Sequence, residues 1–174
     1  MAELLWAADD AIQSAQDGFT AALRFKNQIS ASLLNHGIGH KQFKNTSLGK
    51  LPDSWTVIPL SDLTESSAYG PRFPAESYTP SGNVQTIRTT DFDRKGGLST
   101  TTAPFANLPE DVIESHKLQD GDFLVSRSGA YAGLTAIFKQ AKGAFIPAAF
   151  VIRFRLNERV LPDYLKHLFY SLGV

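Results

Sequence analysis

The chain has 174 residues, of which 43% are hydrophobic and 20% are charged, so it can bury one sizeable core but not two large ones. It contains no cysteine, which excludes structural disulfides and thiolate metal sites. Its 17 basic and 17 acidic side chains cancel, so any nucleic-acid contact has to be local. Neither a signal peptide nor an 18-residue apolar run is present. We therefore expect a cytoplasmic protein that makes no membrane contact.

Residues 5–33 carry apolar side chains at a seven-residue repeat, which predicts a coiled-coil-type helix of about four heptads. The expected pairing face comprises Leu5, Ile12, Ala15, Phe19, Ala22, Ile29 and Leu33. Its many alanines would let a partner helix approach closely. The same pattern also suits an amphipathic helix that folds back onto its own domain. Of these two, we expect a homodimer through the helix. The helix should end near Asn35, because two glycines follow it closely.

The rest of the chain is predicted to consist of short strands and turns. Residues 41–55 read as a polar linker, 56–60 as a first strand and 66–82, rich in proline and glycine, as a loop. Residues 83–93 then predict a strand with Val84, Thr86, Arg88 and Thr90 on one face.

Later segments continue this pattern. Asp120-Gly121 predicts a hairpin turn in which both central residues have positive φ. Strands are expected at 122–128, 134–138 and 144–156, with a turn at 140–143. A last helix should begin at Pro162, with an apolar stripe formed by Leu165, Leu168, Phe169 and Leu172. The order of helix, strands and helix predicts an α+β fold with a helical appendage.

The stretch DGDFLVSRSGAYAG, residues 120–133, combines residue types that occur in several kinds of site. It is no nucleophile elbow, because Leu124 stands where that motif needs glycine before Ser126. It lacks the lysine of a phosphate-binding P-loop. Asp120 and Asp122 have no nearby histidine and are expected to serve the turn. The loop can fit either against another strand or against a sugar-phosphate backbone.

Several segments in order resemble the specificity subunits of type I restriction-modification systems. The run LLNHGIGHKQFKNTSLGKLPDSWTVIPLSDL is similar to the passage from a conserved helix into a target recognition domain. IRTTDF and GDFLVSRSGAYAG resemble the two inner motifs of that domain, and AFIPAAFVIRF and PDYLKHLFYSL follow in the expected order. The resemblance places the spacer helix at 1–40 and the recognition domain at 41–174. It covers essentially the whole chain.

The resemblance implies a protein without chemistry of its own. A complete subunit of the family has two recognition domains and two long antiparallel helices, and each domain reads one half of a bipartite double-stranded DNA target. Methyltransferase subunits bring S-adenosylmethionine, and restriction subunits bring ATP hydrolysis with Mg²⁺, so no cofactor, metal or catalytic residue is expected on this chain. The chain stops before the further strand and second helix of the family pattern. We expect a fragment or a half-subunit with an incomplete recognition domain.

Candidate DNA-binding residues are polar or aromatic, lie in loops or at strand ends, and fall outside the apolar faces. They are Tyr69, Arg72, Tyr78, Asn83, Arg88, Thr90, Asp91, Arg94, Lys95, Arg127, Ser128, Tyr131 and Lys142. Each also has a structural interpretation; Arg88 could pair with Asp91, for example. Two other functions stay open, namely a protein-interaction module that pairs through its helix without reading DNA, and a hydrolase that uses Ser126 or Ser128.

Overall fold

A computed structural model describes residues 2–171 of the chain, which divides into two compact units, Met1–Thr56 and Val57–Val174. The first unit holds the long helix and the hairpin after it. The second holds the remaining strands and helices. The predicted boundary between residues 40 and 41 concerns functional domains and stays a prediction.

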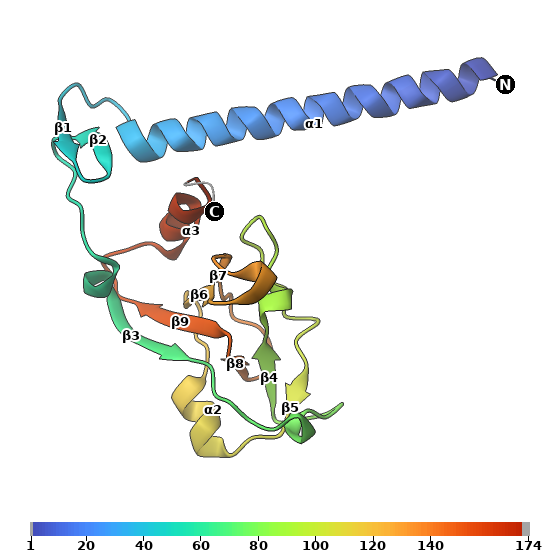
Figure 1. The fold of residues 1–174 in the computed structure, drawn as a ribbon, viewed down its shortest axis with the longest axis vertical. Helices are drawn as coiled ribbons and strands as arrows, with labels where there is room; N and C mark the ends of the chain where they lie inside the picture. The colour runs from blue at the N-terminus through green and yellow to red at the C-terminus, as the bar shows by residue number, and fades with distance from the viewer. Residues whose placement is uncertain (1, 172–174) are drawn as a thin grey trace. The chain divides into compact units, whose positions relative to one another are not determined.

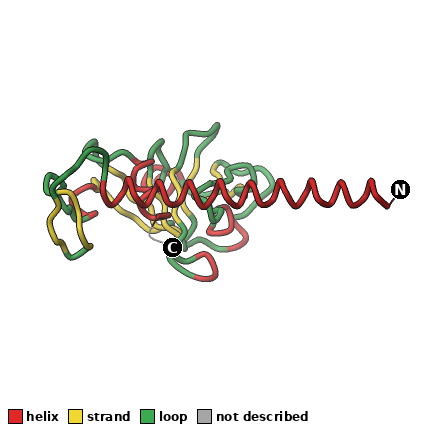
Figure 2. The backbone as a smooth tube through the Cα atoms, turned by 90° about the horizontal axis from the view of Figure 1, so that it is seen from above, coloured by secondary structure: helices red, strands yellow, loops and turns green. Residues whose placement is uncertain are grey.

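The first unit begins with α1, Ala2–His36, which Figure 2 shows as one uninterrupted helix. The predicted long helix is confirmed, including its end just before Gly37. None of its described residues is buried. The prediction of a linker over residues 41–55 was wrong, because β1, Phe43–Thr46, pairs antiparallel with β2, Gly49–Pro52. Bonds from the Thr46 hydroxyl to the Gly49 carbonyl and from the Leu48 N–H to that hydroxyl close the turn, and a hydrophobicity pattern cannot show them.

The second unit is built on two sheets (Figure 1). The larger is antiparallel throughout, in the order β3 (Thr64–Tyr69), β9 (Val151–Leu156), β6 (Phe123–Ser126) and β7 (Thr135–Ile137). The smaller has the order β5 (Phe105–Ala106), β4 (Val84–Ile87) and β8 (Phe145–Pro147), with β4 and β8 parallel. Its helices are α2 (Glu110–His116) and α3 (Pro162–Ser171), with short 3-10 turns at Leu60–Leu63, Ala75–Ser77, Thr89–Asp91 and Gly129–Tyr131. The predicted α+β class is confirmed.

Among the described residues, the core of the second unit consists of three clusters of buried apolar side chains. The largest cluster joins the two sheets, because it includes Ile87 of β4 together with Leu124 of β6 and Val151 of β9. Alternation along β6 turns Phe123 to the opposite face, where it packs with Leu165 of α3. A third cluster packs α2 against the smaller sheet. Each helix therefore covers the outer face of one sheet.

The predicted apolar stripe of the last helix is confirmed in part. Leu165 is buried, and the ring centroid of Phe169 lies 5.2 Å from that of Phe123. Leu168 is half-buried. Leu172 lies outside the described residues.

The prediction of a single strand over residues 144–156 was wrong, because that run forms β8 and β9 in different sheets. A turn in which the Val151 N–H donates to the Ala148 carbonyl separates the two strands. Both strands contribute buried apolar residues, so the sequence shows no polar break between them. An uninterrupted apolar run cannot reveal a change of sheet.

The strand predicted over 83–93 ends early, at Ile87. Beyond it the Asp91 carboxylate accepts a hydrogen bond from the Arg88 N–H at 2.7 Å and holds a 3-10 turn at Thr89–Asp91. Arg88 and Thr90 therefore do not continue the strand face that Val84 and Thr86 begin. At Arg88 the backbone N–H is bonded to the Asp91 side chain, so it does not bond to a neighbouring strand.

Other local predictions were corrected as well. The first strand of the second unit is β3, so residues 56–60 are not a strand and the predicted loop over 66–82 begins inside one. Helix α2 was missed, although its acidic first turn and terminal His116 are helix signals. The turn at Asp120-Gly121 exists, but it leads from α2 into β6 and only Gly121 has a positive φ, 86°. It is therefore not the two-residue hairpin turn that was expected.

Candidate nucleic-acid interface

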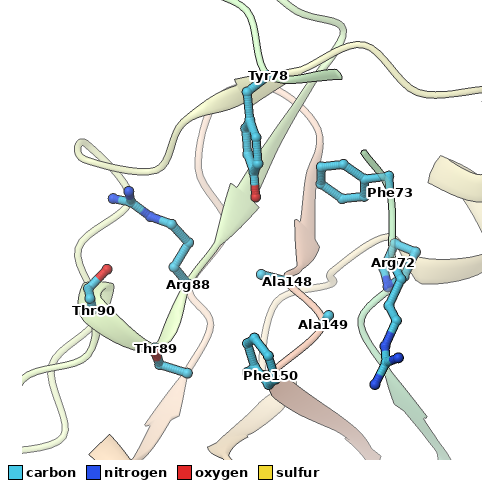
Figure 3. Close-up of a pocket in the computed structure, with 10 residues that line it drawn as sticks. Arg72, Phe73, Tyr78, Arg88, Thr89, Thr90, Ala148, Ala149 and Phe150 are labelled. Atoms are coloured by element: carbon cyan, nitrogen blue, oxygen red, sulfur yellow. The ribbon is translucent and has the colours of Figure 1, made fainter. Parts of the chain in front are cut away.

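A cleft of about 570 Å³ opens where three loops of the second unit converge (Figure 3). The loops follow β3, follow β4, and connect β8 to β9. The lining residues are Pro71, Arg72, Phe73, Tyr78, Arg88, Thr89, Thr90, Ala148, Ala149 and Phe150. Rings and cations thus meet in one place, and four of the lining residues, Arg72, Tyr78, Thr90 and Phe150, are exposed.

Backbone packing fixes the floor of the cleft. The Gly70 N–H donates to the Val151 carbonyl at 3.1 Å, and the Ala148 N–H donates to the Ile87 carbonyl at 2.8 Å. A Cβ on Gly70 would clash with the carbonyl oxygens of Pro147 and Ala148, so only glycine allows the end of β3 to lie this close. The loop between β8 and β9, together with the first residue of β9, is therefore held by hydrogen bonds to the residue after β3 and to the end of β4.

Two arginines and no carboxylate line the cleft. Figure 3 shows Arg72 and Arg88 on opposite sides of Ala148 and Phe150. Arg72 forms no hydrogen bond or ion pair within residues 2–171, so its full charge faces solvent. An exposed arginine of this kind suits a phosphate contact.

Arg88, by contrast, is tied into the framework. Its Nη2 lies 3.0 Å from Oδ1 of Asp91, a carboxylate that is almost fully buried, and also donates to the Thr102 carbonyl at 2.9 Å. The hydrogen bond from Arg88 to Asp91 raises the pKa of Arg88, while partial burial acts in the opposite direction. The predicted pairing of Arg88 with Asp91 is confirmed. Most of the charge of Arg88 is neutralised before any ligand arrives.

Beside the cleft, Arg127 follows β6 directly and lies over two aromatic rings. Its guanidinium carbon is 4.8 Å from the ring centroid of Tyr69 and 5.9 Å from that of Phe150. Its backbone N–H also donates to the Phe150 carbonyl at 3.0 Å. We call Tyr69, Arg127 and Phe150 the Arg127 cluster. It adjoins the cleft, because Phe150 belongs to both.

Several predicted residues have structural partners instead. The Asn83 amide donates to the Leu108 carbonyl and accepts from the Leu108 N–H, so it braces the loop after β5. Asp91 is buried and accepts from Arg88 and from the Thr102 hydroxyl. Tyr131 packs against the largest core cluster, and Ser128 is half-buried.

The remaining predicted residues vary in position. Tyr78 and Thr90 line the cleft, and Tyr78 lies beside Phe73 with ring centroids 5.2 Å apart. Arg94, Lys95 and Lys142 do not line it. The structure thus brings Tyr69, Arg72, Tyr78, Arg88, Thr90 and Arg127 together around one opening.

Sequence reasoning missed Phe73 and Phe150. Phe150 was assigned to the interior of a strand, although it is 54% exposed. The adjacent pair Ala148-Ala149 is a weak sign of a break in the strand, because it interrupts the large apolar residues on either side. No comparable signal marks Phe73.

A second polar cluster is buried and serves the fold. The Asp122 carboxylate accepts from Arg155 Nε at 3.1 Å and from the Gln119 N–H at 2.8 Å, so it serves the turn as predicted. Arg155 and Arg153 both donate to the Lys117 carbonyl. Burial lowers the pKa of Arg153, repulsion from Arg155 adds to this, and Asp122 opposes both. One carboxylate therefore balances two guanidinium groups on the same strand face.

Within residues 2–171, no group of three or more His, Asp or Glu side chains is placed to hold a metal ion. In the same part of the chain, no helix is long and apolar enough to cross a membrane.

Comparison with known proteins identifies the fold. No protein-family model matches the chain. The HsdS subunit from Thermoanaerobacter tengcongensis superimposes with a TM-score of 0.65 at 16% identity, covering 98% of this chain and 38% of that one. A chain from a structure of complex assembly and conformational transition in a type I R-M system gives 0.57 at 18% identity, covering 95% and 40%.

The chain spans about two fifths of the length of each of these proteins. At this level of identity the likeness establishes the fold alone. The resemblance to type I specificity subunits is therefore confirmed as a fold, one that runs through nearly the whole chain.

Proposed function

We propose that this chain is a non-catalytic DNA sequence-recognition subunit, or a fragment of one, of a type I restriction-modification enzyme. The observation that carries the proposal is the shared fold with the HsdS subunit over 98% of the chain. In this proposal the second unit reads one half of a bipartite target in double-stranded DNA. The helix α1 serves as a docking element for methyltransferase subunits, and the restriction subunits join that assembly.

The surface chemistry of the second unit supports DNA as the ligand. Its cleft has cations and aromatic rings on its rim but no carboxylate in its lining, although the chain as a whole is neutral. Such local positive charge attracts phosphate groups without an overall basic field. Arg72 and Arg127 have no carboxylate partner within residues 2–171.

The proposed role requires no chemistry from this chain. S-adenosylmethionine, ATP and Mg²⁺ would act on the methyltransferase and restriction subunits, in the cytoplasm where the DNA is accessible. The hydrolase alternative gains no support, because the Ser126 hydroxyl is buried. A Ser126→Ala, Ser128→Ala variant would test it, since any esterase signal should be identical with and without the two serines.

Fluorescence anisotropy of a labelled duplex across a salt series tests DNA binding directly. A single unit of this size can neutralise about three or four phosphates, so log K should fall against log salt with a slope of about −3 to −4. We expect weak binding, micromolar or poorer, because one half-site lacks the gain from linkage to a second. Nanomolar binding that ignores salt would contradict this picture.

A pure protein-interaction module is the second candidate, and the exposed apolar side chains of α1 favour it. It predicts no salt-dependent binding to any duplex, with self-association intact. The anisotropy series and sedimentation of the same sample therefore distinguish the two functions.

A further inference from the structure

The geometry points to Arg127 as the residue that reads a guanine edge in the major groove, with Tyr69 and Phe150 as the residues that position it. This inference rests on the proposed function, since it requires that the second unit binds DNA. It assigns different roles to the three arginines around the cleft. Arg127 specifies, Arg72 contacts phosphate, and Arg88 supports the loop.

Arg127 is held in place while its hydrogen-bond donors stay unused. Two rings lie within 6 Å of its guanidinium carbon, and its backbone is bonded to the Phe150 carbonyl. Within residues 2–171 its guanidinium donates to no carboxylate and to no carbonyl. A guanidinium fixed in this way loses little conformational entropy when it binds a planar pair of acceptors.

The other two arginines lack this combination. Arg88 uses Nε and Nη2 on Asp91 and on the Thr102 carbonyl, so few of its donors remain available. Arg72 has all of its donors but no ring contact that fixes it. A flexible cation can follow a phosphate, which accepts bonds from many directions. Discrimination between bases needs a fixed direction together with free donors, and only Arg127 of the three combines the two.

The rings of the Arg127 cluster have no role in the core that would explain them. Tyr69 is 57% exposed and Phe150 is 54% exposed, and neither belongs to a buried cluster. Exposed aromatic side chains that gather around one cation are typical of a surface that binds a ligand. Both rings contact Arg127, which makes them positioning residues.

Guanine is the base that suits such a group. In the major groove it presents two acceptors, O6 and N7, which match the two parallel N–H donors of a guanidinium. Adenine offers N7 next to an amino donor, and this donor opposes a cation. A fixed arginine would therefore prefer G·C over A·T at one position of the half-site.

The test begins with a duplex enriched by repeated binding of the full chain to a randomised DNA pool. Each guanine is then replaced singly by 7-deazaguanine, which lacks the N7 acceptor, and affinity is measured by anisotropy. One position should weaken binding to the wild type by about tenfold. In Arg127→Ala, the same replacement should have no further effect, while the salt slope stays unchanged because Arg127 contacts no phosphate in this inference.

The rings and the phosphate contact have matched variants. Tyr69→Leu and Phe150→Leu should reduce the effect of 7-deazaguanine at that position without changing the salt slope. Arg72→Ala is the control, and it should weaken binding to all duplexes alike and make the slope shallower by about 1. Circular dichroism and thermal melting confirm that each variant is folded.

Different outcomes overturn different claims. If Arg127→Ala keeps the full sensitivity to 7-deazaguanine, Arg127 does not read that guanine and the inference fails while DNA recognition stands. If Arg127→Ala weakens all sequences equally and lowers the slope, Arg127 contacts phosphate, with the same consequence. Absence of salt-dependent binding by the wild type would overturn the proposed function, and the inference with it.

Discussion

The two units of the molecule differ in where their apolar side chains lie. In α1 none of the described residues is buried, and Leu5, Ile12 and Ile29 are largely exposed. In the second unit Phe123 and Ile87 are fully buried. Clusters of buried side chains join the two sheets to each other and each helix to one sheet. The second unit thus holds itself together through burial, whereas the helix presents apolar surface that a partner would cover. The contrast separates a unit that has its own buried core from a helix whose apolar side chains stay exposed.

The sharpest form of the comparison replaces one phenylalanine in each unit. Phe123→Ala should lower the free energy of unfolding by about 3–5 kcal/mol, because it removes a fully buried ring between β6 and α3. Phe25→Ala in α1 should change it by less than about 0.5 kcal/mol, since Phe25 is 65% exposed. Urea unfolding followed by circular dichroism measures both. Equal losses would show that the helix packs as tightly as the core.

The buried ion pair offers a second comparison, within the folded unit. Asp122→Ala should cost about 3 kcal/mol of unfolding free energy, because it leaves Arg153 and Arg155 without their carboxylate in the interior. The control is Asp163→Ala, whose side chain is exposed and 3.7 Å from Lys139, and it should cost less than about 0.5 kcal/mol. If the two variants melt alike, Asp122 contributes no more than a surface carboxylate.

Self-association would remove the difference between the two units, because pairing of two copies would bury one face of α1. We expect the chain to sediment as a dimer paired through that face, and Ile12→Asp with Ile29→Asp should shift it to a monomer. The matched control, Ala7→Asp with Ala21→Asp, adds the same charges outside the predicted seam and should leave the dimer intact. Identical sedimentation of the wild type and the seam variant would contradict pairing through this face.

The smallest expected effect concerns which unit contacts DNA. Lys142→Ala removes one exposed cation from the second unit and should make the slope of log K against log salt shallower by about 1. Lys26→Ala removes one from α1 and should leave the slope unchanged. An equal change in both variants would assign phosphate contacts to the helix as well.

The sequence was most informative where the structural signal is local. A seven-residue apolar repeat predicts the helix and the face on which its apolar side chains lie. The glycine that follows His36 explains why the helix ends there. Strand order is not local, because β8 pairs with β4 and β9 pairs with β3 and β6 from distant parts of the chain. In the run 144–156, the pair Ala148-Ala149 is only a weak sign of a break, and it does not indicate that the two halves enter different sheets.

The residues of the candidate site could likewise be predicted only where the signal is local. Arg127 could be found because it interrupts a strand next to serine and glycine, and its charge marks it as a surface residue. Phe150 could not, because an aromatic side chain in an apolar run reads as core until the fold brings it to the surface. Asp91 and Asn83 look like reading residues in the sequence, but their hydrogen bonds to Arg88 and Leu108 bind them into the framework.

The close packing at Gly70 has a consequence for redesign of specificity. Since any side chain at this position would meet the carbonyl oxygens of Pro147 and Ala148, the position is invariable if the two sheets are to stay joined. The side chains of Pro71, Arg72, Phe73, Tyr78 and Phe150 line the cleft, and the requirement for glycine does not extend to these positions. A combinatorial library could therefore diversify residues on both sides of a single fixed glycine. If the second unit reads DNA as proposed, new sequence preferences would arise by changing the rim of the cleft, while the scaffold that orients it stays unaltered.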